Sequence, residues 1–189
     1  MTAFEVRVMF RNMVRSWLDS SSSGYNDFIR ALLLGDVEAM NLYMNQVTQQ
    51  MFSYFDTGSG AQREEQRIGS NAPERFYHGF VLGLIVELSD RYVITSNRES
   101  GFGRYDVVLK PKNASGYVCS PKDQCRDAII IEFKVYDAED ESTLDDTVSA
   151  ALCQIKEKHY AGALEAEGIA PEKIRSYGFA FKGKKVLIG

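Results

Sequence analysis

The chain has 189 residues, of which 44% are apolar and 25% are charged, and its formal net charge is −4. These values are ordinary for one globular domain, alone or with a helical appendage, and no apolar run approaches the roughly 20 residues of a membrane-spanning helix. The acidic balance argues against a surface covered with positive charge for nucleic acid, although a local basic groove remains compatible with it.

The three cysteines, Cys119, Cys125 and Cys153, are odd in number and lack the spacing of a disulfide framework. Thiols in reducing compartments generally stay unpaired. We therefore expect free cysteines in a reducing, cytoplasmic setting. Because no apolar run is long enough for a membrane-spanning helix, we also expect no association with a membrane.

The first 55 residues have the apolar spacing of helices and contain no catalytic pattern. Residues 3–18 place apolar side chains three or four apart with arginines on the other face, and two more helices are predicted over 26–34 and from Asp36 to about residue 55. A Gly- and Ser-containing break follows. We expect residues 1–55 to form a helical N-terminal segment and residues 64–189 to form the main domain.

The rest of the chain alternates between helical and strand patterns. The predicted elements, in chain order, are a helix over 73–88, strands over 91–96, 106–109 and 127–135, a helix over 144–165, and strands over 176–181 and 184–188 joined at Gly183. The order of helix, three strands, helix and two strands predicts an α/β fold with one mixed sheet.

Two of these strands carry charged residues where a core position is expected. Asp106 begins an apolar strand, and Glu132 and Lys134 follow four consecutive apolar residues. Alternation along a strand places Glu132 and Lys134 on one face and Phe133 on the other. Burying an acid and an amine is costly, so core packing does not explain them. Together with the carboxylate of Asp106 from the neighbouring strand, Glu132 would bind a divalent cation beside the ammonium of Lys134. This arrangement suits metal-assisted phosphodiester hydrolysis.

Simpler roles remain open for these residues. Asp106 can be a surface residue that starts a strand, and Lys134 can serve as the counter-ion of the two acids. The catalytic and the counter-ion roles of Lys134 are compatible with each other.

Asp106 followed by Glu132-Phe133-Lys134 on an adjacent strand resembles the PD-(D/E)XK nuclease superfamily. That short pattern also occurs by chance, and the resemblance is more specific because five blocks appear in order: Pro73–Phe80, Gly103–Asp106, Glu132–Lys134, Gln154–Lys158 and Tyr177–Lys185. Together they cover roughly the last two thirds of the chain. The wider sequence looks like the branch found C-terminal to AAA-ATPase-like domains in bacteria.

The resemblance implies a restriction-endonuclease-like core and a nuclease that acts on DNA with Mg²⁺ or Mn²⁺. It implies that Asp106 and Glu132 bind the metal together with the backbone carbonyl of Phe133, and that Lys134 holds the attacking water. It further implies a ligand from the first helix of the core, where His78 and Glu74 are the alternatives.

Gln154 matches the glutamine of the Q-x-x-x-Y motif of RecB-like members, a residue that contacts the active site or DNA. The tyrosine departs from this motif because Tyr160 comes six residues later and position 158 is a lysine. The role of Tyr160 therefore stays open.

Several basic residues are candidates for phosphate contacts, with salt bridges or solvated turns as the alternative. They are Arg104, Lys158, Lys182 and Lys184, with Lys110 and Lys112 as possible members of the same patch.

The segment Thr2–Phe10 looks like the one that follows the ATPase domain in the resembling branch. The resemblance therefore implies a C-terminal piece of a longer protein with an AAA-ATPase-like domain upstream. No GxxxxGK[ST] loop occurs, so we do not expect this chain to hydrolyse ATP. The rival hypothesis is a nuclease fold without activity that serves as a nucleic-acid-binding or protein-interaction module. The acidic charge favours the rival, and the intact Asp106, Glu132 and Lys134 set favours the enzyme.

Overall fold

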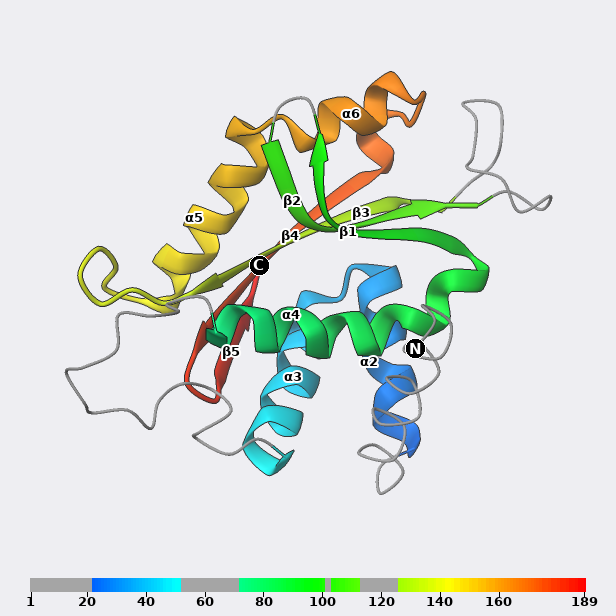
Figure 1. Ribbon diagram of the computed structural model, residues 1–189. Helices are drawn as coiled ribbons and strands as arrows, with labels where there is room; N and C mark the ends of the chain where they lie inside the picture. The colour runs from blue at the N-terminus through cyan, green and yellow to red at the C-terminus, as the bar shows by residue number, and fades with distance from the viewer. Residues whose placement is uncertain (1–21, 52–71, 101–102, 113–125) are drawn as a thin grey trace, which may run out of the picture.

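Figure 1 shows the computed structural model, which describes residues 22–51, 72–100, 103–112 and 126–189. The elements in chain order are helices α2 (Ser22–Leu34), α3 (Val37–Met51) and α4 (Ala72–Ile85), the 3-10 turn η2 (Val86–Asp90), strands β1 (Tyr92–Ser100), β2 (Gly103–Pro111) and β3 (Ala128–Val135), helices α5 (Leu144–Glu157) and α6 (Tyr160–Ala166), the 3-10 turn η3 (Pro171–Lys173), and strands β4 (Ile174–Lys182) and β5 (Lys185–Ile188).

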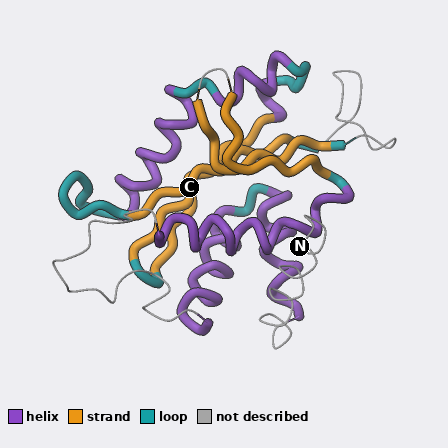
Figure 2. Tube along the Cα trace, in the orientation of Figure 1, coloured by secondary structure: helices purple, strands orange, loops and turns teal. Residues whose placement is uncertain are grey.

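The strands form one five-stranded sheet in the order β1-β2-β3-β4-β5. Strands β3 and β4 are parallel, because α5 and α6 connect them as a crossover, and the other neighbouring pairs are antiparallel. The sheet lies between two layers of helices, with α2, α3 and α4 on one side and α5 and α6 on the other (Figures 1 and 2). The predicted α/β fold with a mixed sheet and a restriction-endonuclease-like core is confirmed.

Alternate residues of β3 contribute to two different hydrophobic cores. Ile129, Ile131 and Phe133 pack with α2, α3 and α4, whereas Ala128 and Ile130 pack with α5 and α6. Alternation along the strand then places Glu132 and Lys134 on the face covered by α5 and α6.

The predicted single helix over 144–165 is wrong, because the chain breaks between α5 and α6. His159 has a left-handed backbone with φ of 51°, which a continuous helix does not allow. At the other helix of the core, α4 ends at Ile85 and a 3-10 turn replaces the predicted last turn.

The described part of the predicted N-terminal segment packs directly on the sheet. Phe28, Leu32, Met40 and Met44 of α2 and α3 belong to the same hydrophobic core as Phe181 of β4. The predicted helix over 3–18 and the proposed boundary between residues 55 and 64 lie outside the described residues.

Two further sequence expectations concern the cysteines and the membrane. Cys153 is an exposed free thiol, while Cys119 and Cys125 lie outside the described residues. None of the helices in the described ranges combines the length and the apolar character needed to cross a membrane.

Candidate active site

Strands β2 and β3 separate at the point where the predicted carboxylates lie. Their ladder pairs Leu109 with Ile129 and ends at Val107 with Ile131. The next pair along this register would be Asp106 with Glu132. Figure 1 shows the first part of β2 turning away from β3, on the side of α5 and α6.

Where the β2–β3 ladder ends, the side chain of Asp106 makes the next hydrogen bond to β3. Its Oδ2 accepts a hydrogen bond from the backbone N–H of Phe133 at 2.9 Å. The carboxylate of half-buried Asp106 therefore lies against β3 at Phe133, the residue that follows Glu132. The N–H of Phe133 is thereby used, and metal ligation by its carbonyl stays a prediction.

A chain of hydrogen bonds joins the second acid to the predicted lysine. The Nζ of Lys134 donates to the Oε1 of Gln154 at 2.8 Å, and the Nε2 of Gln154 donates to the Oε1 of Glu132. Only this orientation of the amide serves both charges, because an ammonium needs an acceptor and a carboxylate needs a donor. Gln154 therefore bridges Glu132 and Lys134.

Glu132 is unusual because its side chain is only 3% exposed. Removing a carboxylate from water costs several kcal/mol unless hydrogen bonds and nearby positive charge compensate. Removing the partner of a buried charge costs about 3–5 kcal/mol. Gln154 donates to one carboxylate oxygen of Glu132 and holds the ammonium of Lys134 nearby, which provides part of that compensation. Replacing buried charged groups with well-packed apolar residues is often neutral or stabilising, so stability alone does not explain the buried acid, which is typical of a functional site.

Gly178 explains how Gln154 reaches Glu132 from a helix. It lies beside Glu132 in the β3–β4 register, and a Cβ at this position would come within 2.9 Å of the carbonyl oxygen of Val148 and 3.0 Å of the Cβ of Ala151. The absence of a side chain lets α5 lie close against β4. This close packing fixes the height of Gln154 above the sheet.

Tyr160 also belongs to the site, although its spacing from Gln154 had left its role open. Its side chain is 2% exposed. Burial, and then the negative charge of Glu132, raises the pKa of Tyr160, while a hydrogen bond with Gln154 acts in the opposite direction. The break at His159 starts a new helix with Tyr160, so a tyrosine six residues after Gln154 still meets it.

The two candidate ligands on the first core helix are His78 and Glu74, and the structure describes the side chain of His78 only. The Nε2 of His78 is 2.8 Å from the Oγ of Ser96, and its ring centroid is 5.3 Å from that of Phe133. Phe133 projects from the face of β3 opposite to Glu132. These contacts of His78 are thus on the α4 side of the sheet, and the side chain of Glu74 is outside the described residues. A ligand role for either residue stays a prediction.

The basic residues proposed for phosphate contacts have different surroundings. The Nζ of Lys182 lies 3.5 Å from the ring centroid of Tyr136, and Lys158 is an exposed residue at the end of α5. The backbone carbonyl of Lys184 accepts a hydrogen bond from the hydroxyl of Thr48 in α3. The side chain of Arg104 is outside the described residues.

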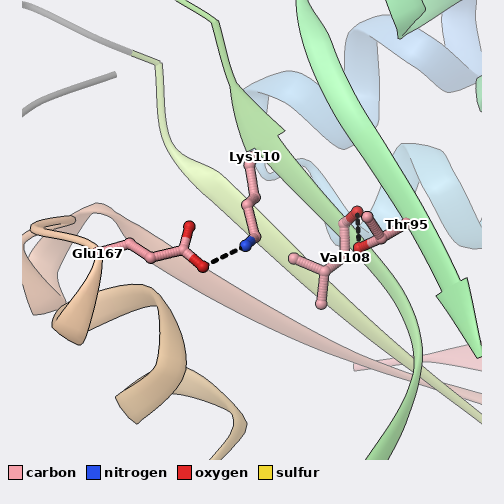
Figure 3. Close-up of polar contacts among 4 residues, drawn as sticks. All are labelled: Thr95, Val108, Lys110 and Glu167. Carbon is pink, nitrogen blue, oxygen red and sulfur yellow. Dashed lines mark hydrogen bonds and ion pairs between the residues drawn. The ribbon is translucent and has the colours of Figure 1, made fainter. Parts of the chain in front are cut away.

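Lys110 and Lys112 make structural contacts within the domain, and a phosphate contact by either residue stays a prediction. The Nζ of Lys110 lies 2.5 Å from the Oε1 of Glu167, which joins β2 to the end of α6 (Figure 3). The same figure shows the hydroxyl of Thr95, which donates a hydrogen bond to the carbonyl of Val108 across the β1–β2 pair. The Nζ of Lys112 donates to the carbonyl of Ser89 at 2.8 Å.

The donor set at this site fits a hard divalent cation held by few protein ligands. Within the described ranges, no group of three or more His, Cys, Asp or Glu side chains is arranged to hold a metal ion. Mg²⁺ often binds through one or two carboxylates, with water and substrate phosphate oxygens as its other ligands. Asp106 and Glu132 are residues of that kind on adjacent strands.

One comparison with known protein families identifies the superfamily of this domain. A family model described as the PD-(D/E)XK nuclease superfamily matches residues 72–189, which is more than half of the chain. No curated protein and no solved structure matches the chain. The matched region runs from α4 to β5 and contains Asp106, Glu132, Lys134, Gln154 and Tyr160. The chain belongs to the PD-(D/E)XK nuclease superfamily.

Proposed function

We propose that the chain is a nuclease that cleaves phosphodiester bonds of DNA and depends on Mg²⁺ or Mn²⁺ bound by Asp106 and Glu132. The observation that carries this proposal is the hydrogen-bond chain from Lys134 through Gln154 to the buried Glu132, beside the carboxylate of Asp106. A bound divalent cation would supply charge neutralisation at the phosphate and a lower pKa for a water molecule.

The protein's own residues would orient the reacting groups. An ammonium has three N–H donors, and the contact with Gln154 uses one of them, so Lys134 can also donate to a phosphoryl oxygen or to the attacking water. Gln154 keeps the ammonium in place because its other end is fixed on Glu132. Tyr160, whose pKa is raised, keeps its proton at neutral pH and supports Gln154 from α6.

The wider proposal includes an AAA-ATPase-like domain upstream in a longer bacterial protein, which would regulate or position the nuclease. Its support is the resemblance of Thr2–Phe10 and the five ordered blocks to that branch of the superfamily. Since this chain has no ATP-binding loop of the GxxxxGK[ST] kind, any coupling to ATP would come from the other domain.

The rival function is a nuclease fold that has lost activity and binds nucleic acid or protein. The observation that favours it is the net charge of −4, which argues against a surface built to bind nucleic acid. The rival predicts binding that does not depend on the charge of Asp106.

Cleavage assays on supercoiled plasmid and on linear single-stranded DNA, with Mg²⁺ or Mn²⁺, test the proposal. Wild type is compared with Asp106→Asn, which keeps an acceptor for the Phe133 N–H, and with Lys134→Ala. We expect metal-dependent cutting that both variants abolish, and the plasmid products tell internal cuts from cuts at ends. Folded wild type that binds DNA without cutting it, with Asp106→Asn binding equally well, would favour the rival.

A further inference from the structure

Helix α3 acts on strand β5 as a neighbouring strand would. The Nδ2 of Asn41 donates to the carbonyl of Ile188, and the Oδ1 accepts from its N–H, both at 2.8 Å. Asn45 makes the same pair of bonds with Val186, at 2.7 and 3.0 Å. Each asparagine amide thus replaces the backbone partner that the edge strand lacks.

The spacing of these side chains matches the spacing of the strand. Four residues of a helix advance about 6 Å, and two residues of a strand advance about 6.7 Å. Residues four apart on α3 therefore meet residues two apart on β5, with the helix running in the opposite direction to the strand. We call the hydrogen bonds of Asn41 and Asn45 to β5 the asparagine ladder. This ladder covers the edge of β5 and so prevents its pairing with other strands.

The same ladder continues into the turn between β4 and β5. The Oγ1 of buried Thr48 donates to the carbonyl of Lys184 at 2.7 Å, with a longer bond from Gln49 at 3.3 Å. From α4, the hydroxyl of Tyr77 donates to the carbonyl of Gly183. The backbone of this turn is therefore held from two helices.

The turn carries lysines on the face of the sheet that holds the candidate active site. In the β3–β4 register, Lys134 lies beside Ala180, so Lys182 projects from the same face, two residues further on. Lys185 pairs with Lys182 across the turn and shares its face. Both lysines are exposed, and the ammonium of Lys182 rests on the ring of Tyr136, the residue that continues β3 beyond Lys134.

We propose that Lys182 and Lys185 bind the phosphate backbone of the DNA substrate next to the cleavage site, and that α3, through Thr48 and its asparagine ladder, is the element that positions them. This inference rests on the proposed nuclease function and adds a substrate-binding subsite to it. It also makes the helical segment before the matched domain a part of substrate binding.

The test measures binding of a short labelled DNA, as duplex and as single strand, in EDTA over a range of salt concentrations. Lys182→Ala with Lys185→Ala should weaken binding about tenfold at low salt and should lower the salt slope by up to about two for duplex DNA. Thr48→Val should weaken binding about threefold or more, and Thr48→Ser, which keeps the hydroxyl, should restore it. Gln46→Ala, an exposed amide on the same helix, is the matched control and should bind like wild type.

A double-variant comparison shows whether α3 acts through the lysines. In the background lacking both lysines, Thr48→Val should have no further effect on binding. An equal loss in both backgrounds, or wild-type binding after removal of the lysines, would overturn the proposal. If wild type cleaves DNA and the lysine variant binds normally, only this inference fails. If folded wild type neither binds nor cleaves DNA, the proposed function fails too.

The ladder can be tested without DNA by hydrogen exchange. The amides of Val186 and Ile188 should exchange slowly in wild type because Asn45 and Asn41 accept their hydrogen bonds. Asn45→Ala should speed exchange at Val186 by about tenfold or more, and Gln46→Ala should leave it unchanged. Unchanged exchange at Val186 in Asn45→Ala would refute the positioning role of α3.

Discussion

Replacing Gln154 with alanine is the most informative change within the site. The substitution removes the acceptor of Lys134 and the donor to Glu132 at once. Each hydrogen bond to a charged partner contributes about 1.5–3 kcal/mol to stability. Part of this loss is recovered, because Lys134 and Glu132 project from one face about 6.7 Å apart along the strand and can then pair directly. We expect Gln154→Ala to lower the free energy of unfolding by about 2–3 kcal/mol.

Urea unfolding followed by circular dichroism measures this loss, and DNA cleavage measures its effect on function. The cleavage rate should fall because the ammonium is no longer held by the amide. Cys153→Ala is the matched control, since Cys153 is exposed and next to Gln154 on the same helix, and its stability should change by less than about 0.5 kcal/mol. If Gln154→Ala behaved like this control in both assays, the bridge between Glu132 and Lys134 would not organise the site.

The remaining predictions concern packing and alkaline pH. Gly178→Ala should destabilise the protein by about 1–3 kcal/mol in urea unfolding, because the added Cβ would meet the carbonyl of Val148. Gly79→Ala should instead stabilise the protein by about 0.5–1 kcal/mol, because nothing lies within 4 Å of the added Cβ and alanine favours the helix. The reverse order of stability would contradict the close packing of α5. Because the pKa of Tyr160 is raised in the folded state, the unfolding free energy should fall as pH rises above about 10, where unfolded tyrosine ionises. Tyr160→Phe should make that fall smaller, and an unchanged pH dependence would show that Tyr160 is not buried beside Glu132.

The central strand and its acids could be predicted from the sequence because their signal is local. Four apolar residues followed by Glu132 and Lys134 define a buried strand, and the period of two assigns the faces. The structure agrees, since Phe133 packs on the α4 side and Gln154 of α5 contacts Glu132 and Lys134. The order of elements was predictable for the same reason.

The position of Tyr160 could not be predicted because no residue signals the helix break before it. Glycine is the usual residue for a left-handed backbone, and His159 adopts that backbone instead. Read as one helix, the sequence puts Lys158 above Gln154, one turn along. Tyr160 is buried in the core formed by β3, α5 and α6, and such tertiary packing overrides the local preference for a continuous helix.

The contact of α3 with the edge of β5 also could not be predicted from the sequence. Asn41 and Asn45 are four apart, which in isolation suggests a polar face exposed to water. Only the fold shows that the edge of β5 lies along that face. The side of the sheet on which His78 lies depends in the same way on the packing of α4, which the helix pattern alone does not fix.

Direct binding of Mn²⁺ to the purified chain tests the account most directly, because it does not depend on knowing the substrate. Titration calorimetry would compare wild type with Asp106→Asn and Glu132→Gln, which keep the hydrogen bonds to Phe133 and Gln154 and remove the charges. We predict saturable binding by wild type, loss of at least about tenfold in affinity in each variant, and a smaller change or tighter binding in Lys134→Ala, which removes a nearby positive charge. Folded wild type that binds no Mn²⁺, or binds it equally well without these two charges, would contradict the proposal that Asp106 and Glu132 form the metal site.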